Sequence, residues 1–199
     1  MLFDFKNKTE LEDHRVKLVP LEQQYYEYLL PISIDDPDLL KYSPQLLGTK
    51  ELLDEYIQNA LNQKKSGLRY PFVIFDKLKN SYAGSTSYGN ISDKDLRLEV
   101  GWTWIGRDFQ RTGLNRHCKF LLLKYAFEDL QFERVEFKTD SRNLQSRKAI
   151  EAIGATYEGA LRSHMLMPDG YRRTSVYYSI LRDEWEQLKN TIFAKQLAK

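Results

Sequence analysis

The chain has little of what metal and disulfide chemistry require. Its 199 residues include one cysteine, Cys118, and three histidines. A single cysteine excludes an intramolecular disulfide framework and a multi-cysteine zinc site. No run approaches the roughly 18 apolar residues of a membrane-spanning helix, and the N-terminus has no long apolar stretch of the secretory kind. These absences predict a soluble protein without a metal, in a reducing, cytoplasmic setting.

An excess of charge of one sign is also missing. The net charge is +2, and no block of five or six basic residues occurs, which argues against nucleic acid as a partner. The pattern GxxxxGK[ST] is absent, which excludes a P-loop phosphotransferase. Apolar residues make up 42% of the chain, enough for a hydrophobic core. The length predicts a single domain over residues 1–199.

Alternation of apolar and polar residues, bounded by turn residues, predicts seven strands. They are expected at residues 15–21, 70–75, 82–90, 96–105, 134–139, 156–165 and 171–181. Helical spacing predicts helices at 21–30, 49–63, 114–125, 143–153 and 184–193. Residues 31–48 are expected to form a long, partly irregular connection. The order predicts an α+β, three-layer fold: a mixed, mostly antiparallel seven-stranded sheet with helices on both faces.

A carboxylate lies inside the core-forming strand at 96–105. Alternation predicts two faces for this strand. One carries Leu98, Val100, Trp102 and Trp104, and the other carries Glu99, Gly101, Thr103 and Ile105. Glu99 has two interpretations: a general base near a reacting amine, or a structural side chain in a salt bridge. The strand alone leaves both open.

A polar turn follows this strand and opens a helix. Its residues are Gln110, Arg111, Thr112, Gly113, Leu114 and Asn115. Gly113 allows a positive φ, and the free N–H groups of a helix start suit a phosphate. A plain helix-starting loop is the other interpretation. In the helix that follows, Cys118 falls on the apolar side and is expected to be a buried small hydrophobe rather than a nucleophile.

A second helix is expected to open at Asn143, three residues before Ser146. Capping alone explains Asn143. In the functional interpretation, Asn143 bonds an amide of an extended cofactor arm and Ser146 points its hydroxyl at the reactive end. The strands that precede the two helix starts are expected to be parallel, so both starts lie at one edge of the sheet.

Together, LEVGWTWIG, QRTGLN, RVEFKTD and NLQSRKAIEAIGA resemble the GNAT acetyltransferase superfamily, in particular its ribosomal-protein N-acetyltransferase-like branch. The resemblance implies the acyl-CoA N-acyltransferase fold, with a central parallel pair splayed for acetyl-CoA. It implies that Thr103, Trp104 and Ile105 pair with the pantetheine arm and that residues 110–115 hold the diphosphate. Asn143 and Ser146 match the family's second helix start. Asn115 stands where the family usually has Gly or Ala.

The resemblance also implies a mechanism in which a primary amine attacks the thioester directly. Glu99 would remove the amine proton, directly or through water, and Ser146 would donate a hydrogen bond to the leaving thiolate. Backbone donors of the splayed strand would stabilise the oxyanion. The alternative from another class is a sensor that binds CoA or acyl-CoA without turnover.

The acceptor stays open between a protein N-terminal amine and a small amine. The acidic side chains in the connection at 31–48 are candidates to attract it, and three aromatic or histidine side chains are candidates to line its cleft. These are Asp35, Asp36 and Asp38, and Tyr42, Tyr88 and His164. A homodimer also stays open.

Overall fold

The computed structural model describes residues 3–197. Its strands are β1 (Leu11–Glu12), β2 (Val16–Pro20), β3 (Arg69–Asp76), β4 (Ser81–Ser92), β5 (Arg97–Ile105), β6 (Arg134–Asp140), β7 (Thr156–Leu166) and β8 (Arg172–Leu181). Its helices are α1 (Tyr26–Asp35), α2 (Lys50–Lys65), α3 (Leu114–Lys124), α4 (Leu144–Glu151), α5 (Arg182–Thr191) and α6 (Ala194–Leu197). Short 3-10 turns are η1 (Gln23–Tyr25), η2 (Pro37–Leu40) and η3 (Arg107–Phe109), and η4 (Tyr125–Asp129) extends α3 as a π-helical turn. No helix within 3–197 has both the length and the apolar character for crossing a membrane.

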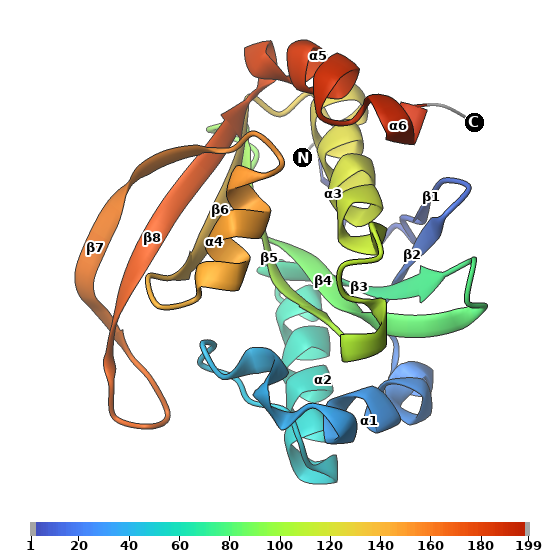
Figure 1. Cartoon of the computed structure of the whole chain (residues 1–199), viewed down its shortest axis with the longest axis vertical. Helices are drawn as coiled ribbons and strands as arrows, with labels where there is room; N and C mark the ends of the chain where they lie inside the picture. The colour runs from blue at the N-terminus through green and yellow to red at the C-terminus, as the bar shows by residue number, and fades with distance from the viewer. Residues whose placement is uncertain (1–2, 198–199) are drawn as a thin grey trace.

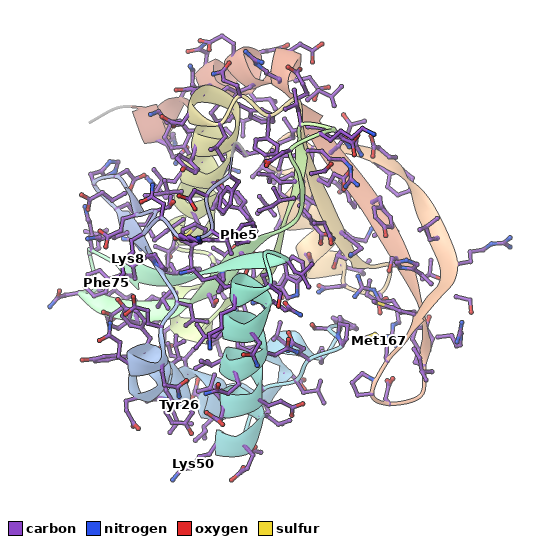
Figure 2. The ribbon with its side chains drawn as sticks, turned by 180° about the vertical axis from the view of Figure 1, so that it is seen from behind. Phe5, Lys8, Tyr26, Lys50, Phe75 and Met167 are labelled. Atoms are coloured by element: carbon purple, nitrogen blue, oxygen red, sulfur yellow. The ribbon has the colours of Figure 1, made fainter. Side chains whose placement is uncertain are left out.

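One mixed sheet organises the molecule, with the strand order β1-β2-β3-β4-β5-β6-β8-β7. Neighbouring strands are antiparallel except β5 and β6, which are parallel. Helices α3 and α4 lie in front of the sheet in Figure 1, and α2 covers the face that Figure 2 turns toward the viewer. The predicted mixed sheet with helices on both faces is confirmed.

The predicted count of seven strands is wrong by one, because the sheet has an eighth, β1. In this two-residue edge strand, Leu11 pairs with Leu18 of β2. Two residues are too few for alternation to reveal them. At the opposite edge β7 pairs only with β8, and its register shifts between Tyr157 and Gly159 and again between Leu161 and Met165.

The apolar core is divided by the sheet into two clusters. The cluster on the α3 side includes Leu18, Phe72, Leu122, Phe137 and Tyr178. The cluster on the α2 side includes Val19, Leu53, Tyr56, Val73 and Trp104. Burial on both faces fixes the orientation of each central strand, because a slip of one residue would exchange the two sets of side chains.

Strand β5 contains such a slip. Gly101 pairs with Ser87 and Trp104 with Ser85, so β5 has one residue more than β4 over this stretch. Trp102 takes the extra length with a φ of +51°. A bulge of this kind breaks the alternation.

The bulge overturns the predicted faces of the strand at 96–105. Before it, Leu98 and Val100 pack in the α3-side cluster. After it, the ring of Trp102 covers Gly89 and that of Trp104 packs on Tyr56, on the α2 side. Thr103 and Ile105 accordingly face α3.

Helix α1 runs through Pro31, whereas the sequence predicted a helix at 21–30 that stops there. Proline removes the hydrogen bond to the carbonyl of Glu27 and no other. Leu29 and Ser33, on either side of Pro31, are fully buried, and the Ser33 hydroxyl accepts the N–H of Gly48 at 3.1 Å. Tertiary contacts thus hold the helix past the proline.

Gly84 offers a test of how tightly β4 and β5 pack. A Cβ added there would overlap the carbonyl oxygen of Trp104, and φ is +149°. Gly159 has nearly the same backbone angle, +152°, but nothing lies within 4 Å of an added Cβ. Gly84→Ala should therefore lower the free energy of unfolding by about 2–4 kcal/mol and Gly159→Ala by about 1–2 kcal/mol.

Urea unfolding of both variants measures this difference. The strain of the positive φ is common to the two, so their difference reports the steric overlap alone. Equal losses of unfolding free energy in the two variants would show that β4 and β5 can move apart at Gly84 without an energetic cost.

Candidate functional site

The sheet opens between its two parallel strands. Residues 97–99 of β5 pair with residues 134–136 of β6, and there the ladder ends. Farther along, residues 101–105 pair only with β4 and residues 137–140 only with β8. The facing edges of β5 and β6 therefore carry backbone groups without sheet partners. An extended ligand that carries amides can satisfy them as an added strand would.

The start of α3 lies at the wide end of this opening. Its N-cap is Gly113, with a φ of +89° as the sequence predicted, and nothing lies within 4 Å of a Cβ added there. The side chain of Gln110 donates to the carbonyl of Ile105 at 2.8 Å, and Thr112 donates to that of Phe109 at 2.7 Å. These bonds fix the turn. The N–H of Leu114 reaches the Thr112 hydroxyl at 3.5 Å, and those of Arg116 and His117 donate to the carbonyl of Gly113. The space beside Gly113 is open at the positive end of α3, where an anion is stabilised.

The start of α4 lies beside it. The side-chain oxygen of Asn143 accepts the N–H of Ser146 at 3.0 Å, which confirms the predicted N-cap. Gln145 donates to Gln110 at 3.1 Å and links the two helix starts. Within residues 3–197, the side-chain N–H groups of Asn143 and the hydroxyl of Ser146 make no hydrogen bond, so both are free to meet a ligand.

The other residues predicted at the cofactor offer mainly backbone groups. The side chains of Trp104, Ile105 and Leu114 are buried in the core, and that of Arg111 is exposed on a residue with a φ of +59°. The side-chain oxygen of Asn115 is buried without a hydrogen-bond donor. This orphan acceptor is a consequence of the departure from Gly or Ala at that position.

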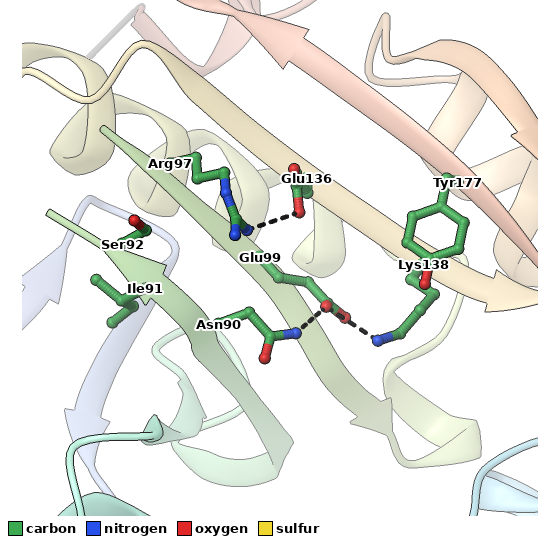
Figure 3. A pocket seen from close by; sticks show the side chains of 8 residues that line it. All are labelled: Asn90, Ile91, Ser92, Arg97, Glu99, Glu136, Lys138 and Tyr177. Carbon is green, nitrogen blue, oxygen red and sulfur yellow. Dashed lines mark hydrogen bonds and ion pairs between the residues drawn. The ribbon is translucent and has the colours of Figure 1, made fainter. Parts of the chain in front are cut away.

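Glu99 lines a pocket of about 420 Å³ on the α2 side of the sheet. Only 4% of the residue is exposed. One carboxylate oxygen accepts from the side-chain amide of Asn90 at 2.7 Å and lies 3.2 Å from the ammonium of Lys138, as Figure 3 shows. The other oxygen has no hydrogen-bond partner within the described chain. The carboxylate is thus ion-paired, as in the structural interpretation, and it also lines a pocket, so the general-base interpretation stays a prediction. The other residues that line the pocket are Ile91, Ser92, Arg97, Glu136 and Tyr177.

The structure does not bring Glu99 and Ser146 into contact. Glu99 faces the α2 side, because its neighbours Leu98 and Val100 face α3. Helix α4, which carries Ser146, packs with Ile150 on the α3 side, and Ile153 just after the helix packs there too. The opening between β5 and β6 is what joins the two sides, so a ligand that reacts at Glu99 and is held at α3 and α4 must pass through it.

A charged residue that the sequence analysis missed lies in this opening. Lys119 comes from α3 and is 6% exposed. Its ammonium donates to the hydroxyl of Thr103 on β5 at 2.9 Å and lies 6.0 Å from the ring centre of Phe137 on β6. Burial lowers the pKa of Lys119 to about 8. A signal was present, because Lys119 lies three residues before Leu122 on the apolar stripe of the helix.

Cys118, the neighbour of Lys119, is fully buried as predicted. Burial raises the pKa of its thiol to about 12. A thiol in that state is neutral and inert at physiological pH, so Cys118 contributes packing rather than chemistry.

Most of the residues predicted to shape the acceptor cleft lie outside the pocket of Glu99. Tyr88 is fully buried on the α3 side and donates to the carbonyl of Leu122 at 2.6 Å. Asp36 accepts the N–H of Asp38, whose carboxylate pairs with Lys41 at 3.0 Å. Asp36 also pairs with Arg107 at 3.4 Å. These groups are thus engaged with protein partners, and neither aspartate lines the pocket of Glu99.

Tyr42 contacts the side of the sheet that carries Glu99. The contact is made by Arg173, a second buried residue that the sequence did not indicate. Arg173 of β8 is 5% exposed and donates to the carbonyl of Tyr42 at 3.2 Å. Its Nε atom has no partner, and burial lowers the pKa of the guanidinium despite nearby Asp140 and Glu99. His164 bonds Ser175 in the hairpin of β7 and β8 at 3.0 Å.

An opened parallel pair with two helix starts beside it is the arrangement that the resemblance implied. Residues 15–156 match the family model described as the acetyltransferase (GNAT) domain, which is well over half of the chain. The chain belongs to the GNAT acetyltransferase family. It is therefore an acyltransferase, of the N-acetyltransferase class.

Individual GNAT relatives support this family membership. The chain is 32% identical over 126 residues to YdaF of Bacillus subtilis (strain 168), provisionally named as a ribosomal N-acetyltransferase, and the match covers 63% of each chain. It is 25% identical over 196 residues to an Aspergillus fumigatus protein named FsC-acetyl coenzyme A-N(2)-transacetylase, covering 92% of this chain and 81% of that one. A GCN5-related N-acetyltransferase from Brucella melitensis superposes with a TM-score of 0.88 at 26% identity, over 96% of this chain and 87% of the other.

The buried ammonium of Lys119 should make folding stability depend on pH. Its pKa is about 8 when folded against 10.5 as a free side chain, so the unfolded chain binds more protons between these values. The free energy of unfolding of the wild type should therefore rise, relative to Lys119→Met, by up to about 3 kcal/mol as the pH increases from 8 to 10.5.

Urea unfolding of both proteins at pH 7, 8, 9 and 10 measures this difference, in which all other titrating groups cancel. Lys124→Met, at an exposed position of the same helix, is the matched control and should follow the wild type. Parallel pH profiles for the wild type and Lys119→Met would contradict the expectation.

Proposed function

We propose that the protein transfers an acetyl group from acetyl-CoA to a primary amine. The observation that carries the proposal is the opening of the sheet beyond Glu99, with two helix starts at one end and a buried carboxylate in a pocket on the other side. The open space above Gly113 and the free polar groups of Asn143 and Ser146 fit a phosphorylated, amide-containing cofactor. The name of the Aspergillus relative supports acetyl coenzyme A as that cofactor.

In this proposal, residues on three elements hold acetyl-CoA. The first N–H groups of α3, from the turn at 110–115, bind the diphosphate. The free backbone edge of Thr103, Trp104 and Ile105 pairs with the pantetheine arm, and the side-chain amide of Asn143 bonds it from α4. When bound, acetyl-CoA supplies an acetyl group activated as a thioester.

Glu99 acts on the acceptor amine from the other side of the sheet. Asn90 and Lys138 hold one of its oxygens, so the second oxygen is oriented into the pocket, where it accepts the amine proton directly or through a water. Ser146 donates a hydrogen bond to the sulfur as it leaves. The N–H groups around the bulge at Trp102 are suited to stabilise the oxyanion. Proximity and orientation can supply roughly 7–11 kcal/mol of the barrier reduction.

Two classes of acceptor agree with the pocket, a protein N-terminal amine and a small amine. The name of YdaF favours a protein acceptor. The lining of the pocket balances Glu99 and Glu136 against Arg97 and Lys138, so its net charge favours neither class over the other. The pocket has room for a few residues or a small molecule.

An acetyl-CoA turnover screen tests the proposed activity. Simple amines, free amino acids and short peptides are offered side by side, and the release of free CoA thiol is followed. We expect sustained release with at least one acceptor class, and selective acetylation of peptides at the N-terminus if proteins are the natural acceptors. Binding of acetyl-CoA without turnover for any acceptor would contradict the proposal.

Substitution of the two proposed catalytic groups tests their roles. Glu99→Gln removes the base and Ser146→Ala removes the donor, and each should lower the turnover rate by about 100-fold or more. Glu27→Gln and Ser66→Ala, at exposed positions of the described chain, are controls that should retain full activity. Rates of both site variants within about threefold of the wild type, with unfolding midpoints unchanged, would rule out these roles.

A further inference from the structure

Lys119 lies at the point where β5 and β6 separate. Its partner Thr103 belongs to the stretch of β5 that has lost β6 as a neighbour, and Phe137 is the first residue of β6 beyond the shared ladder. The ammonium is therefore close to both walls of the opening at its narrow end, on the α3 side of the sheet. Glu99 lies on the opposite side.

The fold alone does not explain a lysine at this position. An ammonium has three N–H donors, and within residues 3–197 it makes one hydrogen bond, to Thr103, with no carboxylate within 4 Å. The hydroxyl of Thr103 has Thr86 at 2.8 Å and the carbonyl of Gly101 at 3.4 Å to receive its own hydrogen. It can therefore present a lone pair to Lys119 and orient the side chain.

A buried charge without a countercharge costs stability, and an apolar side chain would fill the same space at no such cost. The titratable group that acts on Lys119 is the thiol of Cys118, which is neutral. From β5 and β6, the side chains of Thr103 and Phe137 face it, and neither titrates in the relevant range. The two remaining N–H donors are thus available to a ligand in the opening.

The position along α3 indicates which part of a ligand they meet. Lys119 is five residues beyond Leu114, about 7.5 Å along the helix axis from its start, so it lies below the N–H groups that suit a diphosphate. At this depth, the space between the two strands suits a narrow, extended segment of a ligand. In an acylated pantetheine arm the strong hydrogen-bond acceptors of such a segment are three carbonyl oxygens, two in amides and one in the thioester, and the pantoyl hydroxyl is a weaker one near the diphosphate end.

We propose that Lys119 is a cofactor-binding residue whose ammonium donates a charge-assisted hydrogen bond to a carbonyl oxygen of the acylated pantetheine arm. This role rests on the proposed function, because the arm belongs to acetyl-CoA. Thr103 orients the ammonium, and the carbonyl oxygen of the ligand is the second hydrogen-bond acceptor, which the protein itself does not provide. Lysine is retained here at the expense of folding stability.

Titration calorimetry of CoA and acetyl-CoA into the wild type and Lys119→Met tests the role without an acceptor amine. Loss of a charged hydrogen bond should raise the Kd by about tenfold to a hundredfold, while the unfolding midpoint of the variant stays equal or rises. Lys124→Met should bind like the wild type. A weaker affinity for both ligands assigns the bond to an amide carbonyl, and a weaker affinity for acetyl-CoA alone assigns it to the thioester carbonyl.

Proton uptake gives a second readout that lost packing would not change. A carbonyl acceptor favours the charged ammonium, so binding at pH 8.5 should draw a proton onto Lys119. Calorimetry in two buffers of different ionisation enthalpy measures this uptake, and the difference from Lys119→Met cancels the titration of the ligand. Equal affinities and equal proton uptake would overturn the role of Lys119 alone. A wild type that binds neither ligand would overturn the proposed function and this role together.

Discussion

The early end of the ladder between β5 and β6 is the constraint on which the rest of the structure depends. Three residue pairs join the strands, and beyond them each strand has a partner on one side only. Backbone groups in a sheet interior are costly to leave unpaired. The protein offsets that cost by placing two helix starts and polar side chains at the opening, so the incomplete sheet is also a template for an extended ligand.

The bulge at Trp102 gives the opening its two-sided character. The extra residue turns Thr103 toward α3 and Lys119, while Glu99 and its ion-pair partner Lys138 stay on the α2 side. Without the slip, Thr103 would share a face with Glu99. One extra residue in β5 thus gives the sheet a side that suits a cofactor and an opposite side that suits an acceptor.

Local chemistry predicted much of this arrangement, and long-range contacts account for the rest. Alternation located the seven longer strands, and residue type located the N-cap at Asn143, because these features depend on a few neighbouring residues. The bulge does not follow from neighbours in sequence, and helical spacing, which puts Lys119 on the apolar stripe of α3, does not show what its ammonium meets. Both depend on pairings with β4 and β6 that only the folded sheet creates.

The outer edge of β7 has a consequence for association between molecules. A long edge strand with exposed side chains can template pairing with another chain and so lead to aggregation. The two register shifts in β7 interrupt the even spacing that such pairing needs, and exposed Arg162 and His164 add polar, partly charged groups within the second shift. The register shifts in β7 therefore oppose polymerisation of the protein through this edge of its sheet.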